Sequence, residues 1–109
     1  LALAQQPRVL LLDEPTSFLD IAHAAEVMNL VRRLNRDGLT VVTVLHDLIL
    51  AARYSDRIIA VNNGSIAFDG SPRDVLQPAT LEPVFGIPMT VIRDPETGLP
   101  IPLPKATCI

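Results

Sequence analysis

The sequence lacks a long hydrophobic run, and it has only one lysine and one cysteine. Apolar residues make up 49% of its 109 residues, but prolines, glycines and charges divide them into short segments. No segment approaches the roughly 20 apolar residues that a membrane-spanning helix needs, so we expect no such helix. The first six residues contain neither an initiator methionine nor the basic stretch of a signal peptide. We expect them to be the end of a helix that begins outside this sequence.

An excess of positive charge is also absent. The net charge of −3 provides no general basic field, which argues against nucleic acid or anionic lipid as a partner. Cys108 is the only cysteine, so no disulfide bond can form within the chain. This cysteine usage fits a reducing compartment.

The first half of the sequence predicts a strand, a helix and a second strand. Residues 9–12 are large and apolar and lie between turn signals, a pattern typical of a strand buried on both faces of a parallel sheet. Asp20 can cap a helix over about residues 21–36, in which apolar residues recur at helical spacing. Residues 40–45 are rich in β-branched side chains and predict a second buried strand. This order predicts a right-handed βαβ unit with parallel strands.

The second half predicts short helices and two hairpins. Asp47 and Ser71 are suited to cap helices, and Pro72 suits a first helical position. Asn63-Gly64 is a strong hairpin signal, because both central residues of a type I′ turn need a positive φ. Prolines confine the second hairpin to a sheet edge. The expected elements are a helix to about residue 54, strands at 57–61 and 65–68, helices at about 72–77 and 78–86, and strands at 89–93 and 99–103.

Two acidic residues and a histidine follow the two predicted buried strands. Asp13 and Glu14 would lie at the carboxyl edge of the sheet, where α/β proteins bind ligands. One carboxylate could hold Mg²⁺ through water while the other orients or deprotonates an attacking water. His46 should face the same crevice, where it could donate a hydrogen bond to a phosphate oxygen. The alternatives are a solvated acidic turn and a histidine that binds a backbone carbonyl, and we expect His23 to be solvated.

Four segments in order resemble motifs of the ATP-binding-cassette (ABC) ATPases. The run from Val9 to Pro15, Val-Leu-Leu-Leu-Asp-Glu-Pro, resembles the Walker B motif. The run from Thr16 to Asp20 resembles the D-loop, with Phe18 where a small residue or histidine is more usual. Leu45-His46-Asp47 resembles the switch-histidine segment. Residues 52–57, 63–66, 69–72 and 75–76 follow the family's C-terminal pattern.

The resemblance implies roles for five residues, with ATP and Mg²⁺ as cofactors. Asp13 would help coordinate Mg²⁺ through water, Glu14 would be the general base, and His46 would contact the γ-phosphate. Ser17 and Asp20 would act across the interface of a nucleotide-sandwich dimer.

The resemblance also implies a fold and partners. The fold class is α/β, the C-terminal part of a P-loop (ABC-type) ATPase domain with a parallel sheet core, helices and C-terminal β-hairpins. Residues 1–109 would form the C-terminal portion of one such domain, with an edge hairpin and tail at 87–109. The partners would be a second ATPase subunit, transmembrane permease subunits and, indirectly, a substrate-binding protein, at the cytoplasmic face of the membrane. Residues 84–86 and 91–98 resemble importers of iron chelates, haem or cobalamin.

The phosphate-binding half of such an ATPase is missing from the sequence. No Gly-x-x-x-x-Gly-Lys-Ser/Thr motif occurs, and Lys105 has no glycine among the six residues before it. The family's glutamine loop, helical subdomain and Leu-Ser-Gly-Gly-Gln signature are absent too. We therefore expect a truncated chain that is inactive alone and has open apolar strand edges.

Two alternatives stay open. ATPases of DNA repair or chromosome organisation share the Walker B, D-loop and histidine segments, although the second hairpin, the Ser71-Pro72 helix start and the acidic charge argue against them. The second alternative is a non-catalytic short protein that binds a partner through its sheet edge.

Overall fold

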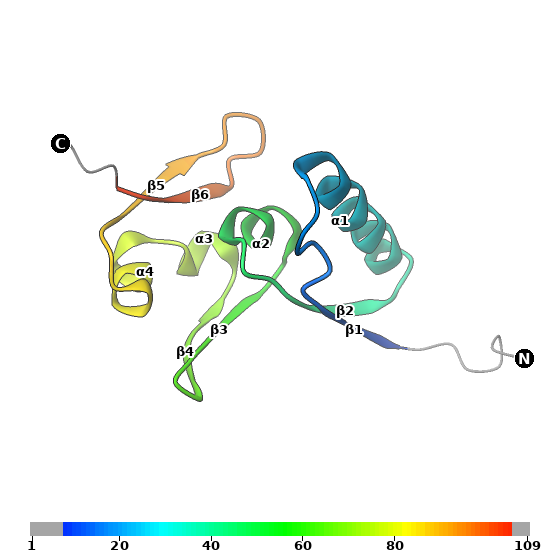
Figure 1. The fold of residues 1–109 in the computed structure, drawn as a ribbon, viewed down its shortest axis with the longest axis horizontal. Helices are drawn as coiled ribbons and strands as arrows, with labels where there is room; N and C mark the ends of the chain where they lie inside the picture. The colour runs from blue at the N-terminus through cyan, green and yellow to red at the C-terminus, as the bar shows by residue number, and fades with distance from the viewer. Residues whose placement is uncertain (1–7, 106–109) are drawn as a thin grey trace, which may run out of the picture. The chain divides into compact units, whose positions relative to one another are not determined.

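The computed structural model describes residues 8–105, and the chain divides between His46 and Asp47 into two compact units (Figure 1). No helix among the described residues has the length and apolar character needed to cross a bilayer. The first unit contains β1 (Val9–Asp13), α1 (Ile21–Arg36) and β2 (Thr40–Val44). The second contains α2 (Leu48–Tyr54), β3 (Ile58–Asn62), β4 (Ser65–Gly70), α3 (Pro72–Val75), α4 (Pro78–Phe85), β5 (Met89–Arg93) and β6 (Pro100–Pro104).

The first unit is the βαβ unit that the sequence predicts. Strands β1 and β2 are parallel, and their register runs from Val9 opposite Thr40 to Asp13 opposite Val44. Helix α1 contacts β2 and buries Met28 on the apolar side that the helical spacing predicts. Asp20 caps α1, because its Oδ1 accepts the backbone N–H of His23 at 2.8 Å. The α/β class and the parallel pairing are thus confirmed.

The prediction that both strands are buried on both faces is wrong for this chain. In β1 and β2 half-buried residues alternate with exposed ones. Leu11 is 73% exposed and Val42 is 50% exposed. Within residues 8–46 the sheet has two strands, and α1 is the only other helix or strand. We call the uncovered side the open face; its apolar residues are Val9, Leu11, Val42 and Val44.

In the second unit, the first hairpin forms around the predicted turn. Strands β3 and β4 are antiparallel, and Asn63 and Gly64 have φ values of 51° and 77°. Both values are positive, as a type I′ turn requires. The side chain of Arg57 donates to both carboxylate oxygens of Asp69 at 2.7 Å and so clamps the open end of the hairpin.

The helices of the second unit enclose a small apolar core. Asp47 caps α2 by accepting the N–H groups of Ile49 and Leu50, as predicted. Helix α3 ends at Val75, two residues earlier than predicted, because the next proline holds Gln77 in an extended conformation (φ −130°, ψ 150°). The buried residues of this core are Ala52, Val75, Leu76, Leu81 and Met89.

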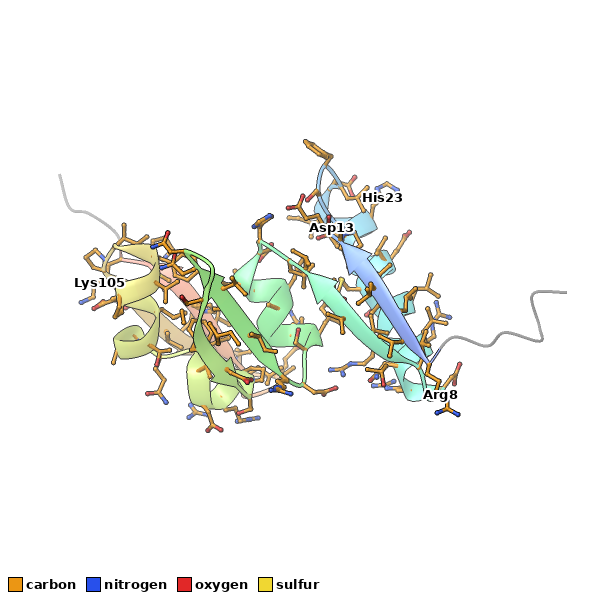
Figure 2. All side chains as sticks on the ribbon, turned by 90° about the horizontal axis from the view of Figure 1, so that it is seen from below. Arg8, Asp13, His23 and Lys105 are labelled. Atoms are coloured by element: carbon orange, nitrogen blue, oxygen red, sulfur yellow. The ribbon has the colours of Figure 1, made fainter. Side chains whose placement is uncertain are left out.

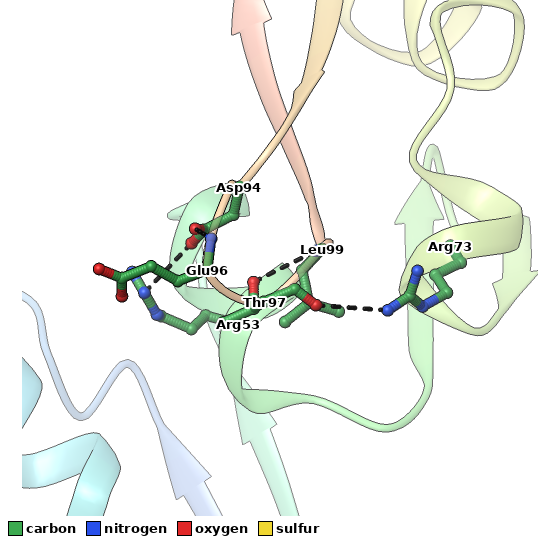
Figure 3. A network of polar contacts seen from close by, with 6 residues as sticks. All are labelled: Arg53, Arg73, Asp94, Glu96, Thr97 and Leu99. Carbon is green, nitrogen blue, oxygen red and sulfur yellow. Dashed lines mark hydrogen bonds and ion pairs between the residues drawn. The ribbon is translucent and has the colours of Figure 1, made fainter.

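The second predicted hairpin is also present. Strands β5 and β6 are antiparallel, and β6 contacts α2. Figure 3 shows that Arg53 and Arg73, from different helices, reach the loop that joins the two strands. Arg53 donates to the Asp94 carboxylate at 3.2 Å, and Arg73 donates to the carbonyl oxygen of Gly98 at 3.2 Å. These contacts tie the hairpin loop to the helices of its own unit.

Candidate functional site

The candidate site lies in the first unit, where β1 and β2 end. Asp13 is the last residue of β1 and lies opposite Val44; Figure 2 shows it at the other end of the strand from Arg8. The backbone N–H of Glu14 donates to the carbonyl oxygen of Val44 at 2.9 Å. This bond carries the strand pairing one residue past Asp13, so both acidic residues are fixed at the carboxyl edge of the sheet.

The side chains of Glu14 and His46 meet although they lie 32 residues apart in the sequence. Nε2 of His46 contacts Oε1 of Glu14. A carboxylate can only accept hydrogen bonds, so this contact fits the imidazole tautomer that has its proton on Nε2. The His46 side chain is 76% exposed and the Glu14 side chain is 41% exposed, so both are open to solvent and to a ligand. The two strands therefore bring the acid and the histidine to one edge, as the sequence predicts.

Ser17 and Asp20 lie in the loop that follows Glu14. The hydroxyl of Ser17 donates to Oε2 of Glu14 at 3.5 Å. The Oδ1 atom of Asp20 is used in capping α1, and it also contacts Nδ1 of His23 at 2.8 Å. His23 is 65% exposed, which confirms the prediction that it is solvated. The roles of Ser17 and Asp20 across a dimer interface stay predictions.

The loop backbone adopts an unusual conformation at two residues. Glu14 and Phe18 have φ values of 49° and 66°, in the left-handed region that bulky side chains rarely adopt. The backbone N–H of Ser17 donates to the carbonyl oxygen of Glu14 at 3.2 Å and closes a tight turn. Such conformations cost of order 1–3 kcal/mol each and gather at functional sites.

Asp13 is the residue that could contribute to a magnesium site. The described residues include no group of three or more His, Cys, Asp or Glu side chains that could hold a metal ion by themselves. Mg²⁺ usually keeps several waters and takes one or two carboxylates together with substrate phosphates. An exposed carboxylate at the sheet edge fits that requirement as one ligand, direct or through water.

The contact between Ser17 and Glu14 is one that sequence reasoning missed. The available signal was the spacing of three residues across Pro15, which favours a turn. The spacing alone does not say that the hydroxyl turns back to the carboxylate, because that depends on the positive φ of Glu14.

Comparisons with known proteins agree with the resemblance. The chain is 48% identical over 99 residues to the hemin import ATP-binding protein HmuV of Rhodopseudomonas palustris, an alignment that covers 91% of this chain and 38% of that protein. It is 47% identical to the petrobactin import ATP-binding protein FpuC of Bacillus anthracis, over 88% of this chain and 36% of that protein. The chain thus spans little more than a third of the length of these relatives. No protein-family model matches it.

A solved structure shows the same fold. A protein assigned to the metal-chelate type of ABC transporter, seen in an inward-facing conformation, matches with a TM-score of 0.79 at 26% identity. The match covers 91% of this chain and 41% of that chain.

Proposed function

Because the chain belongs to the ATP-binding proteins of ABC transporters over the part of their length that it spans, we propose that it carries the catalytic edge of an ATP-hydrolysing importer subunit. The observation that carries this proposal is the contact between Glu14 and His46 where two parallel strands end. The transported substrate would be an iron chelate, haem or cobalamin, since relatives import hemin and petrobactin. The partners would be a second ATPase subunit, permease subunits and, through them, a substrate-binding protein.

In this proposal Glu14 is the general base that accepts a proton from the attacking water. Its carboxylate is 41% exposed at the sheet edge, so water can reach it. His46 would donate a hydrogen bond to the γ-phosphate. One N–H cannot serve both acceptors fully, so the imidazole would loosen its contact with Glu14 when it binds phosphate.

The remaining residues of the site would bind metal and partner. Asp13 would hold Mg²⁺ through water, and bound Mg²⁺ would neutralise charge that develops on the phosphates. Ser17 and Asp20 would contact the second subunit of the nucleotide-sandwich dimer. The whole protein would lie on the cytoplasmic face of the membrane, beside its permease. The 109-residue chain would be inactive alone, because its sequence holds no Gly-x-x-x-x-Gly-Lys loop.

The test of the proposal is Glu14→Gln in the whole ATP-binding protein. Glutamine keeps the size of the side chain but cannot accept a proton, so we expect hydrolysis to fall about 10²–10⁴-fold while ATP affinity is retained. Glu26→Gln is the matched control, because Glu26 is an exposed glutamate on α1 in the same unit. Turnover of Glu14→Gln within about twofold of wild type, the usual effect of a surface change, would refute the catalytic role.

Two further variants separate the proposed roles of the neighbouring residues. His46→Ala should slow hydrolysis with ATP affinity intact, because it removes a contact to the γ-phosphate. Asp13→Asn should instead raise the Mg²⁺ concentration needed for half-maximal activity, because it weakens the metal shell. Hydrolysis is measured beside nucleotide affinity across a magnesium titration. The assignment of these two roles is wrong if the two variants behave alike.

A further inference from the structure

The carboxylate of Glu14 is contacted on both of its oxygens. Oε1 contacts Nε2 of His46, which lies two residues after the end of β2. Oε2 accepts the Ser17 hydroxyl at 3.5 Å, and the backbone N–H of Ser17 bonds to the Glu14 carbonyl at 3.2 Å. Ser17 therefore contacts both the backbone and the side chain of the same residue.

The two residues that contact the Glu14 carboxylate, His46 and Ser17, differ in whether they also have to bind phosphate. His46 is 76% exposed, and its Nε2 proton is the group that we assign to the γ-phosphate. When the imidazole turns toward phosphate, its contact with Oε1 weakens. The Ser17 contact comes from the same tight turn as Glu14 and does not depend on the position of the imidazole. Ser17 can therefore hold the carboxylate at the stage when the base must act.

We propose that Ser17 is a positioning residue for Glu14 within its own chain. A glutamate side chain has several rotatable bonds, and one that is 41% exposed needs a contact to favour one orientation. Hydrogen bonds to ionised groups are stronger than neutral ones, so a serine hydroxyl can provide that bias. This inference rests on the proposed function, because it matters only if Glu14 is the base. It adds a role to the contact across a dimer interface that the resemblance implies for Ser17.

The two roles of Ser17 predict different kinetics. A residue that acts through Glu14 should affect the chemical step, and its effect should disappear when Glu14 can no longer act as a base. If Ser17 acts only across a subunit interface, its replacement should lower the hydrolysis rate by the same factor whether residue 14 is glutamate or glutamine. A double-mutant cycle of positions 14 and 17 therefore separates the two roles.

The experiment uses the whole ATP-binding protein and steady-state hydrolysis of MgATP. We expect Ser17→Ala to lower kcat about three- to tenfold, at the low end for a charged hydrogen bond because 3.5 Å is long. KM should stay within about twofold, and Ser17→Thr should restore most of the loss because it keeps the hydroxyl. Ser65→Ala, an exposed serine in the second unit, is the control and should match wild type.

The cycle is completed with Glu14→Gln and with Ser17→Ala added to it. Ser17→Ala should cause no further loss in single-turnover hydrolysis once Glu14 is glutamine. An equal loss in both backgrounds, or kcat of Ser17→Ala within twofold of wild type while Glu14→Gln is strongly impaired, overturns this inference alone. If Glu14→Gln itself is unimpaired, the proposed function fails first. Ser17→Cys, which keeps the size and replaces the hydroxyl by a weak donor, provides the same test if Ser17→Ala does not fold.

Discussion

Leu11 lies on the open face of the first unit, and replacing it with lysine should have opposite effects in the 109-residue chain and in the whole protein. Leu11 is 73% exposed in this chain. Full burial of a leucine side chain is worth about 1.5–3 kcal/mol, so the uncovered part corresponds to about 1–2 kcal/mol of burial that the chain does not obtain. If the rest of the protein covers this face, Leu11→Lys should cost about 2–5 kcal/mol there, because it removes that burial and places a charge in an apolar layer.

In the 109-residue chain the same substitution should reduce self-association, since it interrupts an exposed apolar surface. Light scattering after size-exclusion chromatography measures that effect, and denaturant unfolding measures the free energy of unfolding of the whole protein. Leu30→Lys is the control, because Leu30 is a leucine of the same unit that is 50% exposed on α1. Equal changes in the unfolding free energy of the whole protein for Leu11→Lys and Leu30→Lys would show that Leu11 is not covered there.

Three further predictions follow from the sequence and the second unit. The 109-residue chain, free of contaminating ATPase, should show no ATP hydrolysis and no ATP affinity in the millimolar range, because it has no phosphate loop. Isothermal titration measures the affinity and a phosphate-release assay measures the hydrolysis. Turnover by the purified chain would contradict the prediction. Gly70→Ala should destabilise the whole protein by about 1–3 kcal/mol, because the new Cβ would lie 2.8 Å from Cγ1 of the buried Val75. Adding Val75→Ala should recover part of that lost stability in the double variant. If thermal unfolding shows instead that the two losses add, no clash exists. The backbone N–H of Glu96, aided by the charge of Arg53, lowers the pKa of Asp94 below its ordinary value of 3.8. The contribution of Asp94 to stability should therefore be complete above pH 3.8 and be lost as the pH falls through the lowered pKa. Acid unfolding followed by circular dichroism should be less steep below pH 3.8 for Asp94→Asn, and an unchanged profile would exclude this contribution.

The helix caps and the hairpin turn could be predicted from the sequence because each depends on a few neighbouring residues. Asp20, Asp47 and Ser71 all accept backbone N–H groups at the helix starts that they were expected to cap. Asn63-Gly64 forms the expected turn, since few other residue pairs tolerate two positive φ values. Helix α3 ends before the predicted residue for an equally local reason, because the effect of Pro78 on Gln77 outweighs helix propensity there.

The burial of the strands could not be predicted from this chain in the same way. A continuous apolar run indicates that both faces of a strand are covered, but it does not say by which residues. In this chain α1 lies on one face of the two-stranded sheet, and Leu11 and Val42 remain largely exposed on the other. The described residues supply a cover for only one face of the sheet, and this is why the predicted burial on both faces is wrong here.

Some contacts of the site follow from the order of the strands, and others depend on the conformation of the loop after β1. The placement of Glu14 and His46 at one edge could be predicted, because parallel strands end at a common edge, but their direct contact could not. The Ser17 contact could not, because it needs a positive φ at Glu14, and the sequence places no glycine there to signal it. The contacts of Arg53 and Arg73 with the loop at 94–98 span 41 and 25 residues, and no local pattern indicates them.

If the proposed roles hold, the charges at the edge should make ATP affinity and ATP hydrolysis respond differently to substitution. Asp13 and Glu14 place two carboxylates side by side in the chain, and these would repel the phosphates of ATP. Under the proposed function, affinity would therefore come from elsewhere, through Mg²⁺ held beside Asp13 and through the backbone donors of a phosphate loop, which this sequence does not contain. Removing the negative charge of Glu14 should then leave ATP affinity equal or stronger while it abolishes most of the hydrolysis. A loss of affinity in Glu14→Gln would mean that this carboxylate organises the phosphate site instead of serving as its base.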